Sequence, residues 1–395
     1  MNFLTLSRLN AFMNIISGNM LPVTSKKTNL PINLKIYWVI VWMIQLSYLT
    51  ACILGIHYVP TENSLKDSTV AMAVTVEAIT LSVYMNSRKN LLRQLIEQLN
   101  ETLKEGDEML RTITMETVNP LQKVLKMYTI GSIGSVNIWI LLQFVKMTRK
   151  EFYYVDYRVP AVFSAEPFSI NVFLAGGMLV CMGSTYAIAK KVSLDLYMIH
   201  LVRLMTAQYK YLRIRFAMIL RHNLKNVEED VWQSVPWKEE QNVKQEMRML
   251  TCHYESIIKM ATILKKVLAP NIGVLYINNV FRFSFLSIMF VMASATEMEK
   301  YLIMSYSIGA LIQLYMLCFS IQELFEASIA VADDAFYEKW CVYDTSLLRA
   351  TAIMTFGSKL ECKLSSVRSI DLTLPSFMSI LNQAYSMCLL FLKAR

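Results

Sequence analysis

The chain has few charged residues and few of the residues that form linkers. Only 17% of its 395 residues are charged, and its 11 glycines and 9 prolines do not cluster into a linker. Soluble domains carry about a quarter charged residues, and a soluble chain of this length usually divides into linked domains. The sequence is 55% hydrophobic, with its charges in blocks between long apolar runs. This pattern is typical of an integral membrane protein.

Motifs for catalysis, metal binding and disulfide bonding are also missing from the sequence. Its 4 histidines are scattered, its 7 cysteines form no CxxC pair, and no Ser/His/Asp, HExxH or phosphate-loop pattern occurs. Four cysteines lie in apolar runs, where cysteine behaves as a small hydrophobic residue: Cys52, Cys181, Cys318 and Cys388. We therefore expect neither an enzyme nor a bound cofactor or metal.

The net charge of +9 does not indicate a nucleic-acid partner. The lysines and arginines flank apolar segments, and no basic stretch is interleaved with aromatic residues. Basic residues beside membrane spans follow from insertion topology and from attraction to anionic lipid. Membrane lipid is therefore the expected partner of these charges.

The N-terminus predicts an amphipathic helix rather than a secretory signal. Apolar residues recur at helical spacing through residues 1–20, at Phe3, Leu6, Leu9, Phe12, Met13 and Ile16. A signal peptide would instead contain one continuous apolar run. We expect this helix to lie along a membrane surface.

Seven segments are long and apolar enough for transmembrane helices, which need about 20 residues each. They are Ile36–Val59, Ser68–Tyr84, Met127–Val145, Pro167–Ala189, Val267–Thr296, Tyr301–Gln322 and Leu372–Leu392. The sequence therefore predicts an all-α integral membrane fold with seven spans.

Amphipathic helices extend three of these spans beyond the membrane. After the second span, leucine and isoleucine recur every three or four residues between positions 92 and 103. The stretch 190–266 predicts two projecting helices joined by a loop at 223–240, and 327–350 is another polar helix. We expect these pieces to pack together on one side of the membrane.

The distribution of lysine and arginine predicts which side that is. The N-terminus and the segments after spans 2, 4 and 6 hold about thirty of these residues, whereas the alternate segments hold about eight. By the positive-inside rule, the N-terminus and the helical extensions are cytoplasmic and the C-terminus is extracellular.

The last seventy residues carry a family resemblance. Three elements occur in order: Gln322–Ser328 followed by Ala335–Trp340, then Leu372–Phe377, then Ala384-Tyr385-Ser386. They are similar to the C-terminal signature of insect odorant receptors, in which a serine precedes A-x-Y-x-x-W and L-x-L-x-x-F, and a Tyr-Ser lies in the last helix. The length and the inverted topology extend this likeness over the whole chain.

Some positions depart from the family pattern. Cys341 follows the tryptophan where the family often has tyrosine, and the run Thr355–Leu364 lacks the usual proline. Ala384 and Phe391 stand where the related gustatory receptors have threonine and glutamine. The first two departures weaken the subfamily assignment but not the family resemblance, whereas Ala384 and Phe391 favour the odorant branch. A gustatory-type receptor channel stays open as an alternative.

The resemblance implies a tuning subunit of a ligand-gated, non-selective cation channel in the plasma membrane of a sensory neuron dendrite. In that family a subunit assembles with an odorant coreceptor into a heterotetramer around one pore, and each subunit binds a small volatile ligand. The implied organisation is a cytoplasmic N-terminal segment at 1–35, six spans with extensions at 36–326, a cytoplasmic anchor at 327–371 and a pore-lining last helix at 372–395.

The resemblance also assigns residues to the pore. Matching the last helix residue by residue places Cys388 and Leu392 at the family's hydrophobic gate, and Tyr385 lies on the same helical face. A ring of apolar side chains can close a pore by excluding water. The alternative is that this face packs against another helix.

Family pockets are built from the second, third, fourth and sixth spans. At the outer halves of these spans the candidate ligand-binding residues are Val76, Glu77, Asn137, Leu141, Phe144, Val172, Phe173, Met304 and Ser305. Ordinary helix packing is the alternative role of each.

Two charges lie inside apolar runs, Glu77 and Arg282. Intramembrane charges are costly and are usually paired or functional. We expect a functional role or an interface position for Glu77, and a structural partner or a lipid headgroup for Arg282.

Two other membrane functions compete with the channel. A metabotropic seven-helix receptor requires the opposite topology, with an extracellular N-terminus. A secondary transporter is expected to show internal repeats with matching broken helices, and Gly176-Gly177 has no counterpart elsewhere in the chain.

Overall fold

The computed structural model describes residues 2–24, 31–58, 69–148, 151–157, 159, 161–228, 237–292, 297–337, 352, 364 and 371–393. Within them the protein is helical, apart from one isolated bridge between Phe152 and Phe168. The helices are α1 (Phe3–Leu6), α2 (Arg8–Ile16), α3 (Ile32–Tyr58), α5 (Thr69–Ser87), α6 (Lys89–Glu105), α7 (Glu108–Leu141), α8 (Ile170–Glu228), α9 (Trp237–Met292), α10 (Glu297–Tyr337) and α12 (Leu374–Lys393). Two 3-10 helices, η1 (Leu142–Thr148) and η2 (Tyr154–Asp156), lie between α7 and α8. The predicted all-α class is confirmed.

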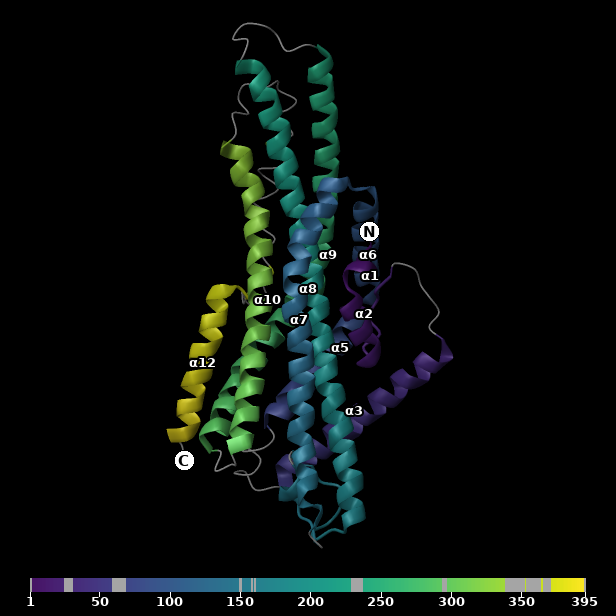
Figure 1. Ribbon diagram of the computed structural model, residues 1–395, viewed down its shortest axis with the longest axis vertical. Coiled ribbons are helices and arrows are strands. Elements are labelled where there is room, and N and C mark those ends of the chain that lie inside the picture. The colour runs from purple at the N-terminus through teal and green to yellow at the C-terminus, as the bar shows by residue number, and fades with distance from the viewer. Residues whose placement is uncertain are drawn as a thin grey trace.

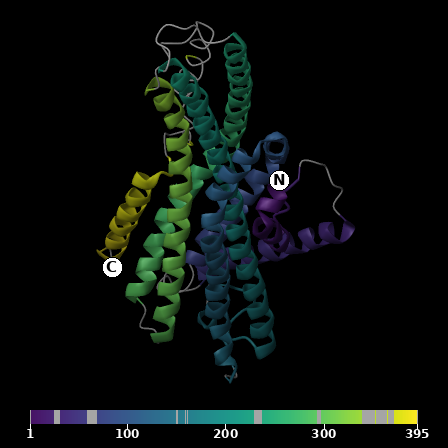
Figure 2. The same ribbon diagram turned by 45° about the horizontal axis from the view of Figure 1, so that its top comes forward.

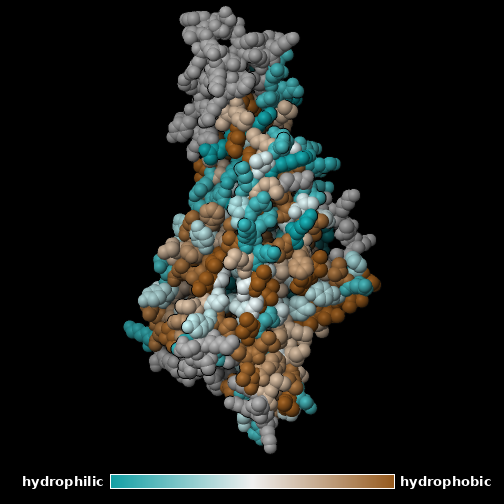
Figure 3. Space-filling model, in the orientation of Figure 1, coloured by the Kyte–Doolittle hydropathy of each residue, from teal (hydrophilic) through white to brown (hydrophobic). Residues whose placement is uncertain are grey.

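Six of the described helices are long and apolar enough to cross a membrane: α3, α5, α7, α8, α9 and α10. The seventh predicted span is α12, whose polar pair Asn382-Gln383 lowers its hydropathy. Side chains such as Met127 and Ile130 are 75% and 66% exposed on the bundle surface. Figure 3 shows such hydrophobic surface gathered over the lower part of the molecule and hydrophilic surface above it. Lipid covers apolar side chains of this kind in a membrane protein.

The helices α8, α9 and α10 continue well past the membrane. The α8 helix has 59 residues, so at about 1.5 Å per residue it is roughly three times as long as the hydrocarbon core is thick. It reaches Glu228, and α9 begins at Trp237, so the loop predicted at 223–240 is shorter than expected. Both helices rise to the same end of the molecule (Figure 1).

The core is centred on α8, which contacts α2, α3, α5, α7, α9 and α10. Almost every side chain between residues 187 and 209 of α8 is buried. The α6 helix packs mainly on α9 and buries the apolar face predicted from its spacing: Leu92, Leu95, Ile96, Leu99 and Leu103. Burial of each such side chain contributes about 1.5–3 kcal/mol, which holds this polar helix against the bundle.

The N-terminal segment packs against the bundle. Phe3, Leu6 and Met13 are buried, α2 contacts α8, and the backbone amide of Phe3 donates to Asn100 at 2.7 Å. The opposite side of α2 exposes Phe12 and Ile15. The predicted amphipathic helix therefore covers protein with one face and leaves an apolar face for a membrane surface.

The last helix lies outside the main bundle, and the C-terminus is at the end opposite the 228–237 junction (Figures 1 and 2). It packs mainly on α9, with a smaller contact to α10. Most of the predicted segment 327–371, with Trp340 and Cys341 of the signature, lies outside the described residues. Val59, Ser68 and Thr296 at the predicted span ends lie outside them as well.

Candidate ligand-binding site

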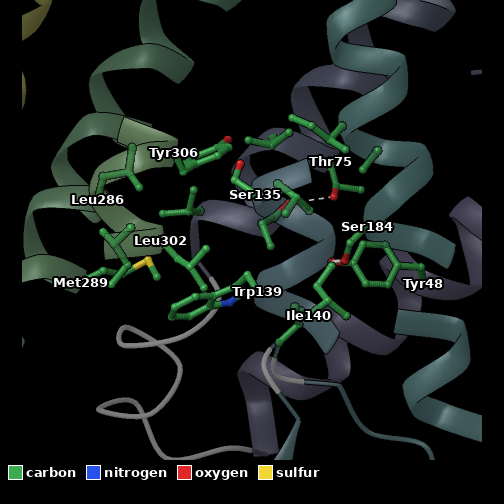
Figure 4. Close-up of a pocket in the computed structure, with 18 residues that line it drawn as sticks. Tyr48, Thr75, Ser135, Trp139, Ile140, Ser184, Leu286, Met289, Leu302 and Tyr306 are labelled. Atoms are coloured by element: carbon green, nitrogen blue, oxygen red, sulfur yellow. Dashed lines mark hydrogen bonds between the residues drawn. The ribbon is translucent and has the colours of Figure 1, made fainter. Parts of the chain in front are cut away.

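A cavity opens inside the bundle between α5, α7, α8, α9 and α10. It contains about 680 Å³ of space free of atoms, part of which is open to the surroundings. Figure 4 shows Leu302 and Tyr306 facing Thr75 and Ser184 across this space, with Trp139 along one side. Tyr48 of α3 and Val159 of the loop before α8 complete the lining.

The cavity exists because small side chains meet there. Ala71 on α5, Ser135 on α7, and Ser184 and Ala187 on α8 all line it. Ala71 and Thr75 are four residues apart, so both project from one face of α5. At this level the facing side chains are small, so a space is left between the helices. Elsewhere in the core, larger side chains fill the corresponding space.

The polar groups of the cavity are neutral hydroxyls. Thr75 donates to the Ala71 carbonyl at 2.7 Å, Ser135 to the Ser132 carbonyl at 3.2 Å, and Ser184 to the Tyr48 hydroxyl at 2.9 Å. Within the described residues the Tyr306 hydroxyl makes no hydrogen bond, so it is free to donate to a ligand. Among the described residues, the lining contains no charged side chain. Such a cavity suits an uncharged, mainly apolar molecule with one hydrogen-bond acceptor.

Glu77 lies beside this cavity but does not line it. Its carboxylate is 2.7 Å from Lys191 Nζ, and its other oxygen accepts from Asn278. Lys191 also contacts Asp195 at 2.7 Å, and all three side chains of this ion-paired set have no exposed surface. Arg282 likewise has structural partners, since it donates to Asn279 at 2.6 Å and to Gln313 at 2.7 Å.

The structure does not bring the nine predicted ligand-binding residues together. Val76, Leu141 and Met304 are 43–53% exposed on the outside of their helices, and Ser305 is exposed beside Met304. Asn137 accepts a hydrogen bond from Thr185 at 2.7 Å, outside the cavity lining. The four helices named by the resemblance do line the cavity, but through other faces.

The remaining three predicted ligand residues belong to an aromatic cluster beside the loop before α8. Phe173 is fully buried and stacks on Phe152 at 4.2 Å, and Phe144 meets it edge-on at 6.3 Å. Val172 packs against the same cluster. Ligand contact by these residues stays a prediction, whereas their role in holding this loop is visible in the packing.

Sequence reasoning missed Trp139, Tyr306 and the small residues of the lining. A signal was available, because Ala71 and Thr75 on α5, and Ser184 and Ala187 on α8, are spaced one turn apart within apolar spans. Small residues at such spacing mark close helix approach. Whether two helices that approach closely leave a cavity between them depends on the side chains of the facing helix.

The three predicted pore residues share one face of α12 but differ in exposure. Tyr385 is 66% exposed, Cys388 is 5% exposed, and Leu392 is partly buried. Phe391 contacts Phe285 of α9 at 6.1 Å. In the single chain, the face of α12 that is free to meet other subunits includes Tyr385 and Leu389.

Comparisons with known proteins agree with this arrangement. The sequence model described as 7tm Odorant receptor matches residues 63–385. No curated protein sequence matches the chain. The structure is similar to that of the insect olfactory receptor OR5 from Machilis hrabei, with a TM-score of 0.78 and 12% identity over 98% of this chain and 97% of that one.

The same receptor solved in complex with eugenol matches with a TM-score of 0.77 and 13% identity, over 100% of this chain and 99% of that one. At this identity the structural likeness establishes the fold, while the family assignment rests on the sequence match over most of the chain. The chain is a multi-pass membrane protein and belongs to the 7tm odorant receptor family.

Proposed function

We propose that the chain is an odorant receptor subunit that binds a small neutral volatile in the cavity and opens a non-selective cation channel together with a coreceptor. The observation that carries this proposal is the mainly apolar cavity, lined by no charged side chain among the described residues, within an odorant receptor fold. The eugenol complex of the similar receptor supports this class of ligand, since eugenol is a small, mainly apolar molecule. Expression with and without a coreceptor, with current recorded against a broad panel of neutral volatiles, tests it. Strong odour-evoked current from this chain alone would contradict the need for a coreceptor.

Filling the cavity is expected to abolish the response. Ala71→Phe places a ring in the space between α5 and α10, so a ligand and the new side chain cannot both fit. The odour-evoked current of the coexpressed channel should be lost, or should need more than about tenfold more odorant, a loss of roughly 1.4 kcal/mol or more of binding free energy. Current normalised to surface-labelled protein measures this.

Val83→Phe is the matched control, because Val83 lies on the same helix but is 53% exposed on its outer side. It is expected to keep the wild-type response. An unchanged response of Ala71→Phe at normal surface amount would remove the cavity as the ligand site.

The proposed topology follows from the charge asymmetry. Residues 1–35, the helical extensions within 36–326 and the segment 327–371 are cytoplasmic, and the helix in 372–395 leads to an extracellular C-terminus. A tag at the N-terminus should react with antibody only after cells are permeabilised, whereas a C-terminal tag should react on intact cells. The reverse labelling would favour a metabotropic seven-helix receptor.

In this proposal the last helices of four subunits line the pore of a heterotetramer in the plasma membrane of a sensory dendrite. The position of α12 on the outside of the bundle supports this role, because a pore on a symmetry axis needs a helix that meets its copies. Tyr385, Cys388 and Leu392 remain the proposed residues of the pore and gate.

A further inference from the structure

Four buried ionisable side chains form a network in the bundle interior, one helical turn or two from the cavity. They are Glu77 of α5, Lys191 and Asp195 of α8, and Arg282 of α9, each at most 2% exposed. Lys191 Nζ lies 2.7 Å from a carboxylate oxygen of Glu77 and 2.7 Å from one of Asp195. The charge of Arg282 also interacts electrostatically with both carboxylates. Two positive and two negative charges balance, as burial away from water requires.

Neutral partners extend this charged network to five helices. Tyr128 of α7 donates to Asp195 at 3.0 Å, and Asn278 of α9 donates to Glu77. Arg282 donates to Asn279 and, across the helix interface, to Gln313 of α10. The helices α5, α7, α8, α9 and α10 that share this network are the same five that form most of the cavity wall.

Each of these helices passes from the cavity into the charged network. On α9, Leu286 lines the cavity one turn from Arg282. On α10, Tyr306 lines the cavity two turns from Gln313. The Tyr306 phenol group also interacts electrostatically with Arg282. A displacement of α9 or α10 at the cavity must therefore be accommodated at Arg282.

The opposite side of the same α9 segment holds the last helix. Ser284 donates to the Ala384 carbonyl at 3.1 Å, and the Tyr276 hydroxyl is 3.0 Å from the Ser379 hydroxyl. Gln383 donates to the Tyr276 hydroxyl at 2.9 Å. These contacts to α12 flank Arg282 on both sides along α9.

The network also has spare hydrogen-bonding groups. Among the described residues, Arg282 Nε and Gln313 Nε2 are buried without a hydrogen-bond partner. A buried donor without an acceptor is unfavourable, so this arrangement is not the fully satisfied one. An element with unused donors can exchange partners when a neighbouring helix moves.

We infer that this charged network is the coupling element through which an occupied cavity acts on α12. In the resting state it fixes the α9 segment 276–286, and its partners rearrange when ligand displaces α9 and α10. This inference rests on the proposed channel function, and Gln313 and Arg282 are positioning residues in it.

Gln313→Leu tests the inference, since it removes one acceptor of Arg282 and an unpaired Nε2 without changing the net charge. It is expected to raise ligand-free current, normalised to surface-labelled protein, by about threefold or more, because a hydrogen bond to a charged group is lost from the resting state. The same variant should speed the reaction of Tyr385→Cys with extracellular 2-(trimethylammonium)ethyl methanethiosulfonate. Both measurements use a Cys388→Ser background and need no odorant.

Gln143→Leu is the matched control. Gln143 is equally buried and donates to the Gly177 carbonyl at 3.3 Å, away from the cavity lining and the charged network. It is expected to leave ligand-free current and reaction rate unchanged. Normal surface amount with unchanged current and rate in Gln313→Leu would overturn the inference.

If Gln313→Leu does not reach the cell surface, Arg282→Lys is the second test of the inference. It keeps the positive charge but removes the guanidinium group that donates to Asn279 and Gln313. Loss of both variants from the surface would assign the network to folding alone and also overturn the inference. If the reagent changes the current of Tyr385→Cys, but at the same rate with and without Gln313→Leu, the inference fails and the proposed function stands. Absence of any effect at Tyr385→Cys would instead count against the proposed pore.

Discussion

Lys191→Met is expected to lower the free energy of unfolding by about 3–5 kcal/mol, one of the largest effects open to a single substitution in this chain. Lys191 is the only described cation within ion-pair distance of Glu77 and Asp195, and neither carboxylate has exposed surface. Its removal leaves two negative charges in the bundle interior, where no water can solvate them. The loss is measured as a shift in the midpoint of thermal unfolding in detergent. The fraction of protein that stays monodisperse after heating reports that midpoint.

Lys190→Met is the matched control one residue away. Lys190 is equally buried, but its Nζ lies 3.7 Å from the Trp42 ring and donates no hydrogen bond among the described residues. The variant loses a cation–π contact of about 2 kcal/mol but also removes the cost of burying a charge, so the expected net effect is small. Adding Glu77→Gln to Lys191→Met should recover part of its loss. Equal destabilisation by the two single variants would contradict this account.

The spans could be predicted because the hydrocarbon core of a membrane requires every backbone polar group to be hydrogen-bonded within the protein. A continuous apolar run of about 20 residues must form a helix that satisfies its own backbone, and α3, α5 and α12 follow the predicted ranges closely. The helical extensions were equally visible, since water and protein on opposite faces impose the spacing seen in α6. These features depend on local sequence alone.

The cavity faces could not be predicted in the same way. Lipid and protein interior are both apolar, so a membrane helix does not reveal which side faces inward. The predicted Val76, Leu141 and Ser305 are each the immediate neighbour of a residue that lines the cavity, and one residue turns a helix by about 100°. The prediction therefore chose helices that line the cavity but named residues on other faces of them.

The charged network shows another limit of sequence reasoning. The predicted fourth span ends at Ala189, because two lysines follow it and basic residues beside an apolar run usually mark its end. The structure buries both of them inside the bundle. Glu77 was recognised as unusual, but its partner is 114 positions away, and nothing local to either residue connects them.

Leu392→Glu is expected to raise ligand-free current several-fold and to shift cation selectivity. The prediction assumes that α12 of four subunits surrounds the pore, so that the side chain at 392 joins a narrow apolar ring. Water leaves such a ring readily, and ions then meet a barrier. A carboxylate would hold water there and attract cations. Current at zero odorant and reversal potentials in exchanged cation solutions measure both effects, with surface labelling as the control for expression.

Cysteine accessibility shows which face of α12 the pore uses. Tyr385 is 66% exposed and Cys388 is 5% exposed in the single chain, so a cysteine at 385 should react in the closed state with a charged extracellular methanethiosulfonate reagent, whereas Cys388 should react only when the helix moves. Faster modification of Cys388 in odorant, abolished by Cys388→Ser, would place that side of the helix at the gate of the open channel. If Cys388 is unreactive in both states and Leu392→Glu leaves current and selectivity unchanged, this face of α12 packs against protein and the pore lies elsewhere.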